Sequence, residues 1–271
     1  MTLRRKTLDL IGLTFVGLIL VSYVALHVTL IRGLVVDHEV YHGRLETQRL
    51  LSLLAHNLSM LDALAADWAQ WDDTYAFIED TDDEYVQSNL VDGTFSGLGL
   101  NLMLFANTSG EIVFGKAFDL QNKREVAIPQ GLAEHLTADS PLLQPLDGES
   151  STTGILLLPE GPMLVASQPI LTSEGQGPSR GTLVMGRYLD DTEIERLAMQ
   201  ALLPFTAHRQ TDAQVSSDLQ TARASLSAGT SVFVRPLDAQ TLAGYALLRD
   251  IYGQPALVLR LEMPRDYYQQ S

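Results

Sequence analysis

Apolar residues in the first third of the chain recur with a period that predicts one long helix. Between residues 34 and 78 there is no proline, and Gly43 is the single glycine. The apolar positions stand three or four residues apart, which places them on one face of an α-helix: Leu50, Leu54, Leu58, Leu61, Leu64, Trp68, Trp71, Tyr75 and Ile78. Apolar residues nearer the start of this helix are candidates to face a partner helix: Leu34, Tyr41, Leu45 and Leu51.

Short apolar runs separated by turn residues follow this helix and predict strands. Runs on either side of 107–110, and on either side of 159–162, have the pattern of β-hairpins. A run at 182–189 leads into a helix for which Asp190 is the expected N-cap, with Glu193 three residues on. Four more runs end the chain, so we predict an α+β fold in which a long N-terminal helix packs on a mainly antiparallel sheet.

The N-terminal segment predicts a membrane anchor. Arg4, Arg5 and Lys6 precede an apolar run from Leu8 to Ile31, which is long enough to cross a bilayer and has its basic flank on the cytoplasmic side. A cleavable signal peptide is the alternative, but its apolar core is usually about 7–15 residues long. We therefore favour an uncleaved signal anchor, with residues 1–7 in the cytoplasm, 8–31 in the membrane and 32–66 forming a stalk helix.

Net charge and composition restrict the kinds of partner that the chain can bind and the kinds of side-chain chemistry that it can perform. Four of the 18 basic residues and one of the 33 acidic residues lie before position 33, so the exported part carries a formal charge near −18. Such a surface disfavours nucleic acid and anionic lipid as partners and is compatible with cations. The chain has no cysteine, which excludes disulfides and thiolate chemistry.

The strongest candidate site lies in "DWAQWDDTYAFIEDTDDEY" at 67–85, which contains both tryptophans. On a continuous helix Trp68, Trp71, Asp72 and Tyr75 share a face, whereas Asp73 lies about 100° away. Buried rings hydrogen-bonded to a carboxylate would form core between helix and sheet. Exposed rings beside a carboxylate would instead suit a small molecule with a cationic group.

Other motifs for catalysis or metal binding are weak. Histidines are scattered, and the acidic run at 79–84 lacks the glycine and spacing of a calcium loop. The sequence has neither a nucleophile elbow nor a phosphate-binding loop. We therefore expect no catalytic residue, no metal and no cofactor in this chain, and we rank a hydrolase below a sensor or a structural module.

Several segments, in order, resemble the type-4 CHASE domain, a cyclase- and histidine-kinase-associated extracellular sensor. They are "DWAQWDDTYAFI", "YVQSNL", "LGLNLMLFANTSGEIV", "GTLVMGRYLDDTEIERLA" and "LRDIYGQPALVLRLEMPR", within about 40–265. The resemblance implies a Cache/PAS-like fold and a periplasmic input domain at 67–265, anchored in a bacterial inner membrane. Matching positions are Trp68, Trp71, Asp72, Asp73, Tyr75, Asn89, Asn101, Gly110, Gly181, Gly186, Arg187, Asp250, Gly253 and Pro255.

The resemblance implies a receptor whose cytoplasmic output is a GGDEF diguanylate cyclase, an EAL phosphodiesterase or a histidine kinase. Residues 266–271 would then begin the link to a second transmembrane helix. We predict a homodimer through the stalk helix and an unknown small-molecule ligand, with these ligand-binding residues: Trp68, Trp71, Asp72, Asp73, Tyr75 and Asn101. The alternative is a structural, dimerisation or protein-interaction module without a small-molecule ligand.

Overall fold

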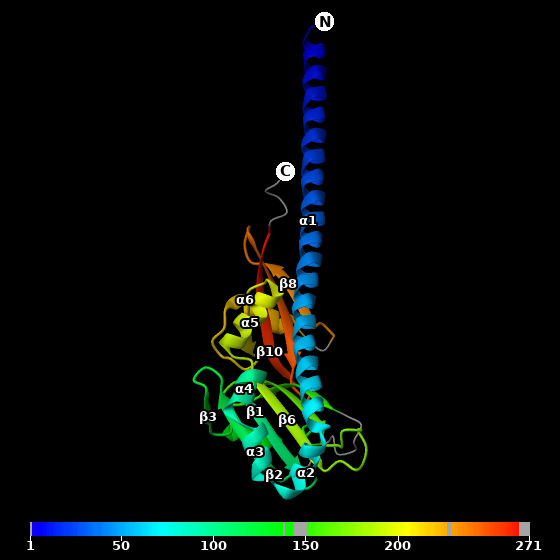
Figure 1. The fold of residues 1–271 in the computed structure, drawn as a ribbon. Coiled ribbons are helices and arrows are strands. Elements are labelled where there is room, and N and C mark those ends of the chain that lie inside the picture. Colours follow the sequence, from blue (N-terminus) through cyan, green and yellow to red (C-terminus); the bar gives the residue numbers. More distant parts are fainter. Residues whose placement is uncertain (1, 138, 144–150, 227–228, 266–271) are drawn as a thin grey trace.

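The computed structural model describes residues 2–137, 139–143, 151–226 and 229–265, with side chains described from 14–27 and from 38 onward within those ranges. A single helix, α1 (Thr2–Ala69), extends along the whole molecule (Figure 1). Its buried residues follow the predicted period as far as the helix reaches: Leu50, Leu54, Leu61, Ala65 and Ala69. The predicted helix is therefore confirmed up to Ala69, and the remaining predicted turns, to residue 78, belong to a separate helix.

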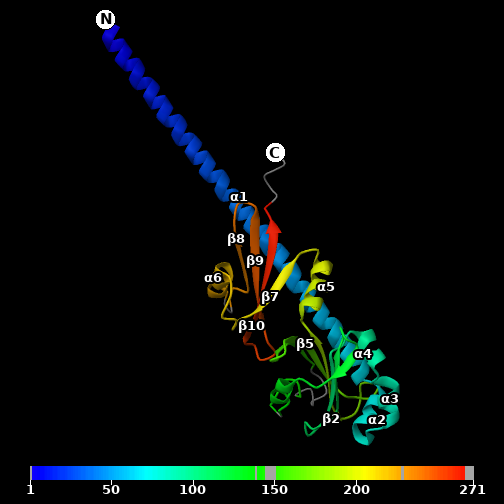
Figure 2. The ribbon, with the colours of Figure 1, turned by 90° about the vertical axis from the view of Figure 1, so that its left-hand side faces the viewer.

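Two antiparallel sheets lie one beyond the other along α1, where the sequence predicted one (Figures 1 and 2). The distal sheet has the order β3-β2-β1-β6-β5-β4. Its strands are β1 (Leu102–Asn107), β2 (Ile112–Asp119), β3 (Arg124–Val126), β4 (Thr152–Leu157), β5 (Pro162–Pro169) and β6 (Gly181–Tyr188). Both predicted hairpins are confirmed, as β1–β2 and β4–β5.

The proximal sheet lies nearer the start of α1 and has the order β7-β10-β9-β8. Its strands are β7 (Phe205–Arg209), β8 (Val232–Pro236), β9 (Thr241–Arg249) and β10 (Pro255–Pro264). The connection from β6 to β7 contains α5 (Asp191–Ala201), and α6 (Ser217–Ser225) follows β7. Asp190 caps α5 by accepting a hydrogen bond from the Glu193 amide at 2.9 Å, as predicted.

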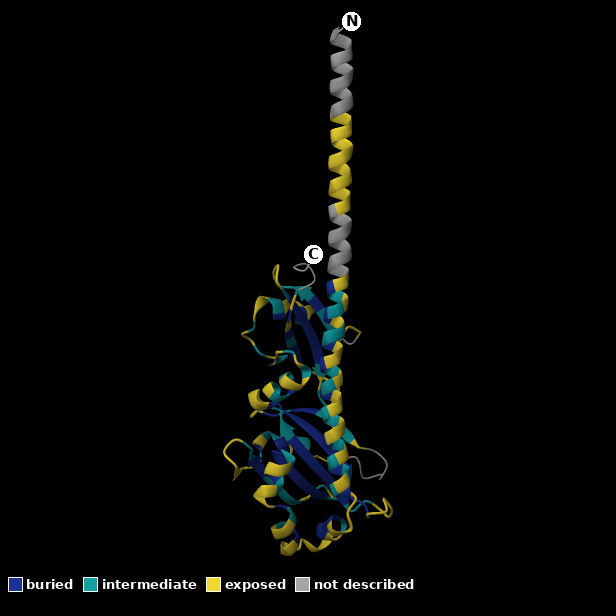
Figure 3. Cartoon of the chain, turned by 45° about the horizontal axis from the view of Figure 1, so that its top comes forward, coloured by how far each residue is buried: buried dark blue, intermediate teal, exposed yellow. Residues whose placement is uncertain are grey.

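Short helices complete the distal unit. They are α2 (Asp72–Asp80), α3 (Asp83–Asn89), α4 (Asp92–Leu98) and the 3-10 helix η1 (Gln130–His135). One face of the distal sheet packs on α1 and contributes Met103, Phe105 and Met185 to the main core. The opposite face is filled by the chain's own side chains, including Leu132 of η1 and Leu142. Both faces of the distal sheet are therefore buried (Figure 3).

The proximal sheet approaches α1 closely at two glycines, one on each element. A Cβ on Gly244 of β9 would lie 2.2 Å from the Thr47 Oγ1, and one on Gly43 of α1 would lie 2.7 Å from Leu242. Thr47 is fully buried, and its hydroxyl donates to the Gly43 carbonyl at 2.7 Å. This close packing resists sliding of α1 along the proximal sheet, because it leaves no free space between the two elements.

The N-terminal part of α1 stands clear of both sheets (Figure 3). Apolar side chains in 14–27 are exposed, among them Phe15, Leu18 and Leu26. The predicted anchor at 8–31 lies partly outside the residues whose side chains are described. Across the portion that is described, no helix is long and apolar enough to cross a membrane.

A partly buried polar triad joins α6 to the proximal sheet. The Asp218 carboxylate accepts hydrogen bonds from the Tyr245 hydroxyl at 2.5 Å and the Arg260 Nε at 2.7 Å. Burial on its own raises the pKa of Asp218, but hydrogen bonds from Ser216, Tyr245 and Arg260 and the charge of Arg260 together hold that pKa well below its usual value. The triad is therefore most stabilising when Asp218 is ionised.

Replacing Asp218 with asparagine should lower the free energy of unfolding at pH 7 by about 2 kcal/mol, because it removes a charge that accepts two hydrogen bonds. The folded pKa lies below the unfolded one, so this stabilisation is complete above roughly pH 4 and is lost as the pH falls toward the folded value. Urea unfolding at pH 7 and pH 3 should therefore show a smaller gap between wild type and Asp218→Asn at pH 3.

The control is Glu262→Gln, which removes the more exposed partner of the same arginine. It should change stability by less than about 0.5 kcal/mol. Equal losses for Asp218→Asn at both pH values would show that the carboxylate charge is not the source of the stabilisation.

Candidate functional site

The predicted tryptophan and aspartate face is divided by a break in the helix. α1 ends at Ala69, and Trp71 has an extended backbone (φ −130°, ψ 131°) before α2 starts at Asp72. Trp68, Trp71, Asp72 and Tyr75 therefore do not share one helix face, which corrects the expectation from their spacing. The spacing misled because a break of two residues leaves the apolar pattern on both sides intact.

Asp72 fastens the start of α2 to the loop that follows β5. Its carboxylate accepts a hydrogen bond from the Ser173 amide at 3.0 Å, and the Ser173 hydroxyl accepts one from the Asp72 amide at 3.0 Å. The same loop satisfies the end of α1, since the Leu171 amide donates to the Ala69 carbonyl at 3.1 Å. Asp72 thus uses its amide and one carboxylate oxygen to close a junction within the chain.

Tyr75 packs on the same loop. Its hydroxyl donates to the Pro178 carbonyl at 3.2 Å, and the Arg180 guanidinium lies 3.9 Å from the ring centroid. Arg180 also donates to the Tyr75 carbonyl at 2.8 Å and pairs with Glu79 at 3.1 Å. The cation over this ring is therefore a side chain of the protein itself.

Trp71 and Asp73 lie together beside a shallow acidic depression of about 360 Å³, which is also lined by Asp80, Asp82 and Glu84. The acidic run forms the α2–α3 junction, where the Asp82 carboxylate accepts from the Glu84 amide at 3.0 Å. Trp68 meets Trp71 edge-on at 6.3 Å between centroids and is half-buried against the main core.

Behind this depression lies Tyr85, which the sequence did not single out. It is buried, and its hydroxyl is 2.7 Å from that of the buried Thr74. Burial raises the pKa of Tyr85 to about 12, with Asp73 adding to the shift and the Thr74 hydrogen bond opposing it. Tyr85 therefore stays neutral and acts as core.

Removing the Asp72 carboxylate should loosen the 172–180 loop. Asp72→Ala is expected to lower the free energy of unfolding by about 1 kcal/mol, through loss of a cap-type hydrogen bond and of a negative charge at the α2 N-terminus. Amide hydrogen exchange at Ser173 should accelerate. Asp73→Ala is the matched control, because it removes a first-turn charge without a bond to the loop; equal effects of the two changes would contradict the assigned role.

Asn101 lies away from the tryptophans, at the start of β1. Its side-chain amide donates to the Phe118 carbonyl at 3.0 Å, and its oxygen accepts from the Tyr188 amide at 2.9 Å. Asn101 thereby joins the ends of β2 and β6. The structure does not bring it together with the other five predicted ligand-binding residues.

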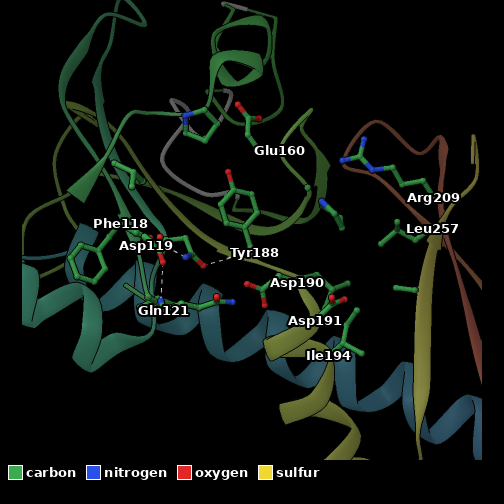
Figure 4. Close-up of a pocket in the computed structure, with 18 of the residues that line it drawn as sticks. Phe118, Asp119, Gln121, Glu160, Tyr188, Asp190, Asp191, Ile194, Arg209 and Leu257 are labelled. Carbon is green, nitrogen blue, oxygen red and sulfur yellow. Dashed lines mark hydrogen bonds between the residues drawn. The ribbon is translucent and has the colours of Figure 1, made fainter. Parts of the chain in front are cut away.

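A larger cavity, of about 840 Å³, opens between the two sheets beside Asn101 (Figure 4). Its walls come from the end of β2, the β4–β5 turn, the end of β6, the start of α5, and strands β7 and β10. We call it the inter-sheet cavity. The residues that line it include Asn101, Phe118, Asp119, Pro129, Glu160, Tyr188, Asp190, Asp191, Ile194, Arg209, Asp212 and Leu257.

Tyr188 is the central aromatic residue of the inter-sheet cavity. Its ring stands between Glu160 on one side and Asp190 on the other (Figure 4). Burial raises the pKa of Tyr188 to about 12, and the Glu160 charge adds to the shift. The phenol is therefore neutral at physiological pH and presents both its ring and its hydroxyl.

The start of α5 is bound to α1 and to the distal sheet by a buried ionic cluster. The Glu193 carboxylate accepts from Arg196 at 2.7 and 2.6 Å and lies 3.7 Å from Arg187. Arg196 also donates to the Asn57 side chain of α1 at 2.9 Å. This cluster links one wall of the inter-sheet cavity to the long helix.

Sequence reasoning missed most of this cavity because its lining residues come from seven separate segments of the chain. Asp190 was recognised as a helix cap, and Arg187 and Asn101 only through the family resemblance. Tyr188 had no distinguishing signal, since an aromatic residue at the end of a strand is ordinary core.

Comparison with solved structures finds a similar fold in other proteins. The extracellular domain of the putative histidine kinase vpHK1S-Z8 aligns with 86% of this chain and 97% of its own length, with a TM-score of 0.54 and 10% identity. That similarity shows the fold alone. A domain of a putative sensory box/GGDEF family protein from Vibrio parahaemolyticus aligns with 85% of this chain and 96% of its own length, with a TM-score of 0.48 and 11% identity.

Comparison of the amino-acid sequence with models of protein families identifies the family of this chain. A model of the CHASE4 domain matches residues 53–208, and the chain belongs to the CHASE4 family, as the resemblance predicted. The match contains the whole distal sheet and ends within β7. The methanogenesis regulatory histidine kinase FilI of Methanothrix harundinacea (strain 6Ac) is 33% identical over 275 residues. That alignment covers 98% of this chain, whereas the chain spans 29% of the relative's length.

Proposed function

We propose that this chain is the sensory input region of a membrane-bound signalling receptor. Membership of the CHASE4 family supports this function, as does identity across nearly the whole chain to part of a histidine kinase. In this proposal residues 8–31 cross a bacterial inner membrane, residues 1–7 lie in the cytoplasm and the two-sheet domain lies in the periplasm. Exposed Phe15, Leu18 and Leu26 support the span, because apolar side chains without protein cover are suited to lipid.

The observation that carries the proposal is the packing of both sheets on one uninterrupted helix. The distal sheet rests on the end of α1, and the proximal sheet locks onto α1 near Thr47. The last described residue, Arg265, bonds the buried Glu39 of α1 at 2.7 and 3.1 Å. A change in the relative position of the sheets must therefore displace α1, which is how a stimulus would travel toward the membrane.

Pairing of two copies through α1 completes the proposal. One stripe of α1 lies outside the main core, and its positions are spaced alternately four and three residues apart. It consists of Tyr41, Leu45, Gln48, Ser52, Ala55 and Ser59, all exposed except Leu45. This is the spacing of a coiled-coil seam, and its small residues permit close approach. Leu51, which the sequence grouped with the seam, instead packs against the core. We propose a histidine-kinase output, with a GGDEF cyclase or an EAL phosphodiesterase as the alternatives.

The experiment exploits the absence of cysteine in the chain. Residues 1–271 replace the matching region of FilI, and single cysteines are placed at Ser52 or Ser59 on the seam, or at Arg49 or His56 as exposed controls. In membrane vesicles we expect faster disulfide formation at the seam positions. We also expect kinase autophosphorylation to change at least about threefold when the seam disulfide forms, which corresponds to a shift of only about 0.7 kcal/mol between two states.

Two outcomes would contradict this proposal. Equal crosslinking at all four positions would overturn the paired α1 helices. Selective crosslinking without any change in autophosphorylation would favour the structural alternative, in which the domain dimerises but carries no signal.

A further inference from the structure

The inter-sheet cavity has the size and the mixed lining of a small-molecule site. Its volume of about 840 Å³ lies within the range of ligand pockets, roughly 300–1,000 Å³. Phe118, Ile194 and Leu257 supply apolar surface, and Tyr188 supplies an aromatic face. This combination of an apolar lining with a few convergent polar groups is typical of sites for small organic ligands.

The charges around the cavity are strongly one-sided. Five carboxylates line it, from Asp119, Glu160, Asp190, Asp191 and Asp212, against one guanidinium, that of Arg209. Arg209 is partly occupied, because its Nη2 donates to the Leu158 carbonyl at 2.6 Å and to the Pro159 carbonyl at 3.4 Å. The local field therefore repels anions and attracts cations.

The N-terminus of α5 does not reverse this field. Its positive end already faces Asp190, Asp191 and Glu193, which lie in or directly before the first turn. An anion placed there would meet three carboxylates. The helix terminus consequently gives no reason to expect a phosphate or a carboxylate ligand.

Some carboxylate oxygens around the Tyr188 ring are not used in hydrogen bonds within the protein and can bind a ligand. The Glu160 Oε1 accepts from the Gln130 amide at 3.1 Å and the Asp190 Oδ1 caps α5, which leaves the second oxygen of each available. Among the described residues no hydrogen bond is found to the Asp191 carboxylate or to the Tyr188 hydroxyl, whereas the Tyr188 amide donates to Asn101 at 2.9 Å. A cation over the ring would gain a cation–π contact together with charge pairing.

We propose that the inter-sheet cavity binds a small organic cation, an amine or ammonium compound with an apolar body, against the Tyr188 ring between Glu160 and Asp191. The inference rests on the sensory function proposed above and assigns its ligand class and site. A ligand that fills the cavity contacts the distal sheet, the start of α5 and, through Leu257 of β10, the proximal sheet. Binding therefore favours one relative position of the sheets, and α5 passes that preference to α1 through the bond from Arg196 to Asn57.

The test is calorimetric titration of the full chain in detergent micelles with phenethylammonium and with 1,4-diaminobutane. The shape-matched anion 3-phenylpropanoate and Ca²⁺ alone are the comparison probes. We expect at least one cation to bind with a Kd below 1 mM, and neither comparison probe to bind. Tyr188→Leu, Glu160→Gln and Asp191→Asn should each weaken cation binding by about three- to tenfold, as expected for single cation–π or ionic contacts.

The matched control is Glu195→Gln, which removes the same charge from an exposed position of α5 outside the cavity and should leave the Kd unchanged. Binding of 3-phenylpropanoate or Ca²⁺ as tightly as the cations, equal loss in Glu195→Gln, or no cation binding at 1 mM would each overturn the site. If a cation binds but the FilI chimaera ignores it, the site stands and the sensory function fails. If the seam disulfide changes autophosphorylation of the chimaera but no cation binds, the sensory function stands and the proposed site fails.

Discussion

Gly181→Ala is expected to lower the free energy of unfolding by about 3 kcal/mol or more, because it combines backbone strain with a steric clash. Gly181 begins β6 with φ +157°, and an added Cβ would lie 2.1 Å from the Ala106 carbonyl oxygen. That oxygen belongs to β1, which pairs with β6 in the centre of the distal sheet. The clash cannot be relieved by a side-chain rotation, so the β1–β6 pairing itself must yield.

Gly97→Ala is the matched control for this change. Gly97 lies in α4, and a Cβ there would meet no atom within 4 Å. Because alanine favours helix over glycine, stability should stay unchanged or rise by up to about 1 kcal/mol. Urea unfolding followed by circular dichroism measures both variants, and a Gly181→Ala loss below about 1 kcal/mol would contradict the clash.

Glu193→Gln is the second change with a large expected effect. Glu193 is buried and receives two hydrogen bonds from Arg196, with Arg187 nearby. Removing its charge leaves Arg187 and Arg196 without the anion that they share. Loss of one partner of a buried pair costs about 3–5 kcal/mol, and partial exposure of both arginines reduces the expected loss here to about 2 kcal/mol.

Chemical denaturation of Glu193→Gln and of Glu195→Gln checks this value. Both variants lose one carboxylate from α5, but only Glu193 is buried. A second measurement, hydrogen exchange along α1 near Asn57, should show faster exchange in Glu193→Gln because Arg196 is no longer held in place. Identical behaviour of the two variants would contradict a structural role for the ionic cluster.

The residues at the end of β6 and the start of α5 connect the inter-sheet cavity to α1. Arg187 donates to the carbonyls of Leu98 and Gly99 at the end of α4, Tyr188 faces the cavity, and Glu193 with Arg196 reaches Asn57. This contiguous set of contacts is a physical route for coupling. The seam disulfide and ligand titration described above test whether the route transmits a change, which contact alone does not establish.

Local patterns in the sequence predicted most of the individual elements correctly. Both hairpins and the Asp190 cap appear as predicted. These features depend on neighbours a few residues apart, so their signals are contained in short segments. Family membership was likewise readable from ordered motifs.

The number of sheets and the positions of the candidate residues were not readable in this way. Nothing in the strand sequences indicates that β6 ends one sheet and β7 begins another, since that depends on how both pack along α1. The spacing placed Asp72 on a helix face with the tryptophans. In the structure its carboxylate instead accepts a hydrogen bond from Ser173, which lies 101 residues away. Long-range partners of this kind leave no periodic mark in either segment.

The sequence by itself determined the long amphipathic helix, the antiparallel strands, the acidic charge and the CHASE4 family, because each follows from local periodicity, composition or ordered motifs. Tertiary structure alone decided that α1 stops at Ala69, that Asp72 and Tyr75 are occupied by the 172–180 loop, and that Tyr188 faces a cavity between two sheets. In each case the deciding energy comes from hydrogen bonds and packing between segments distant in the chain, which no local pattern records.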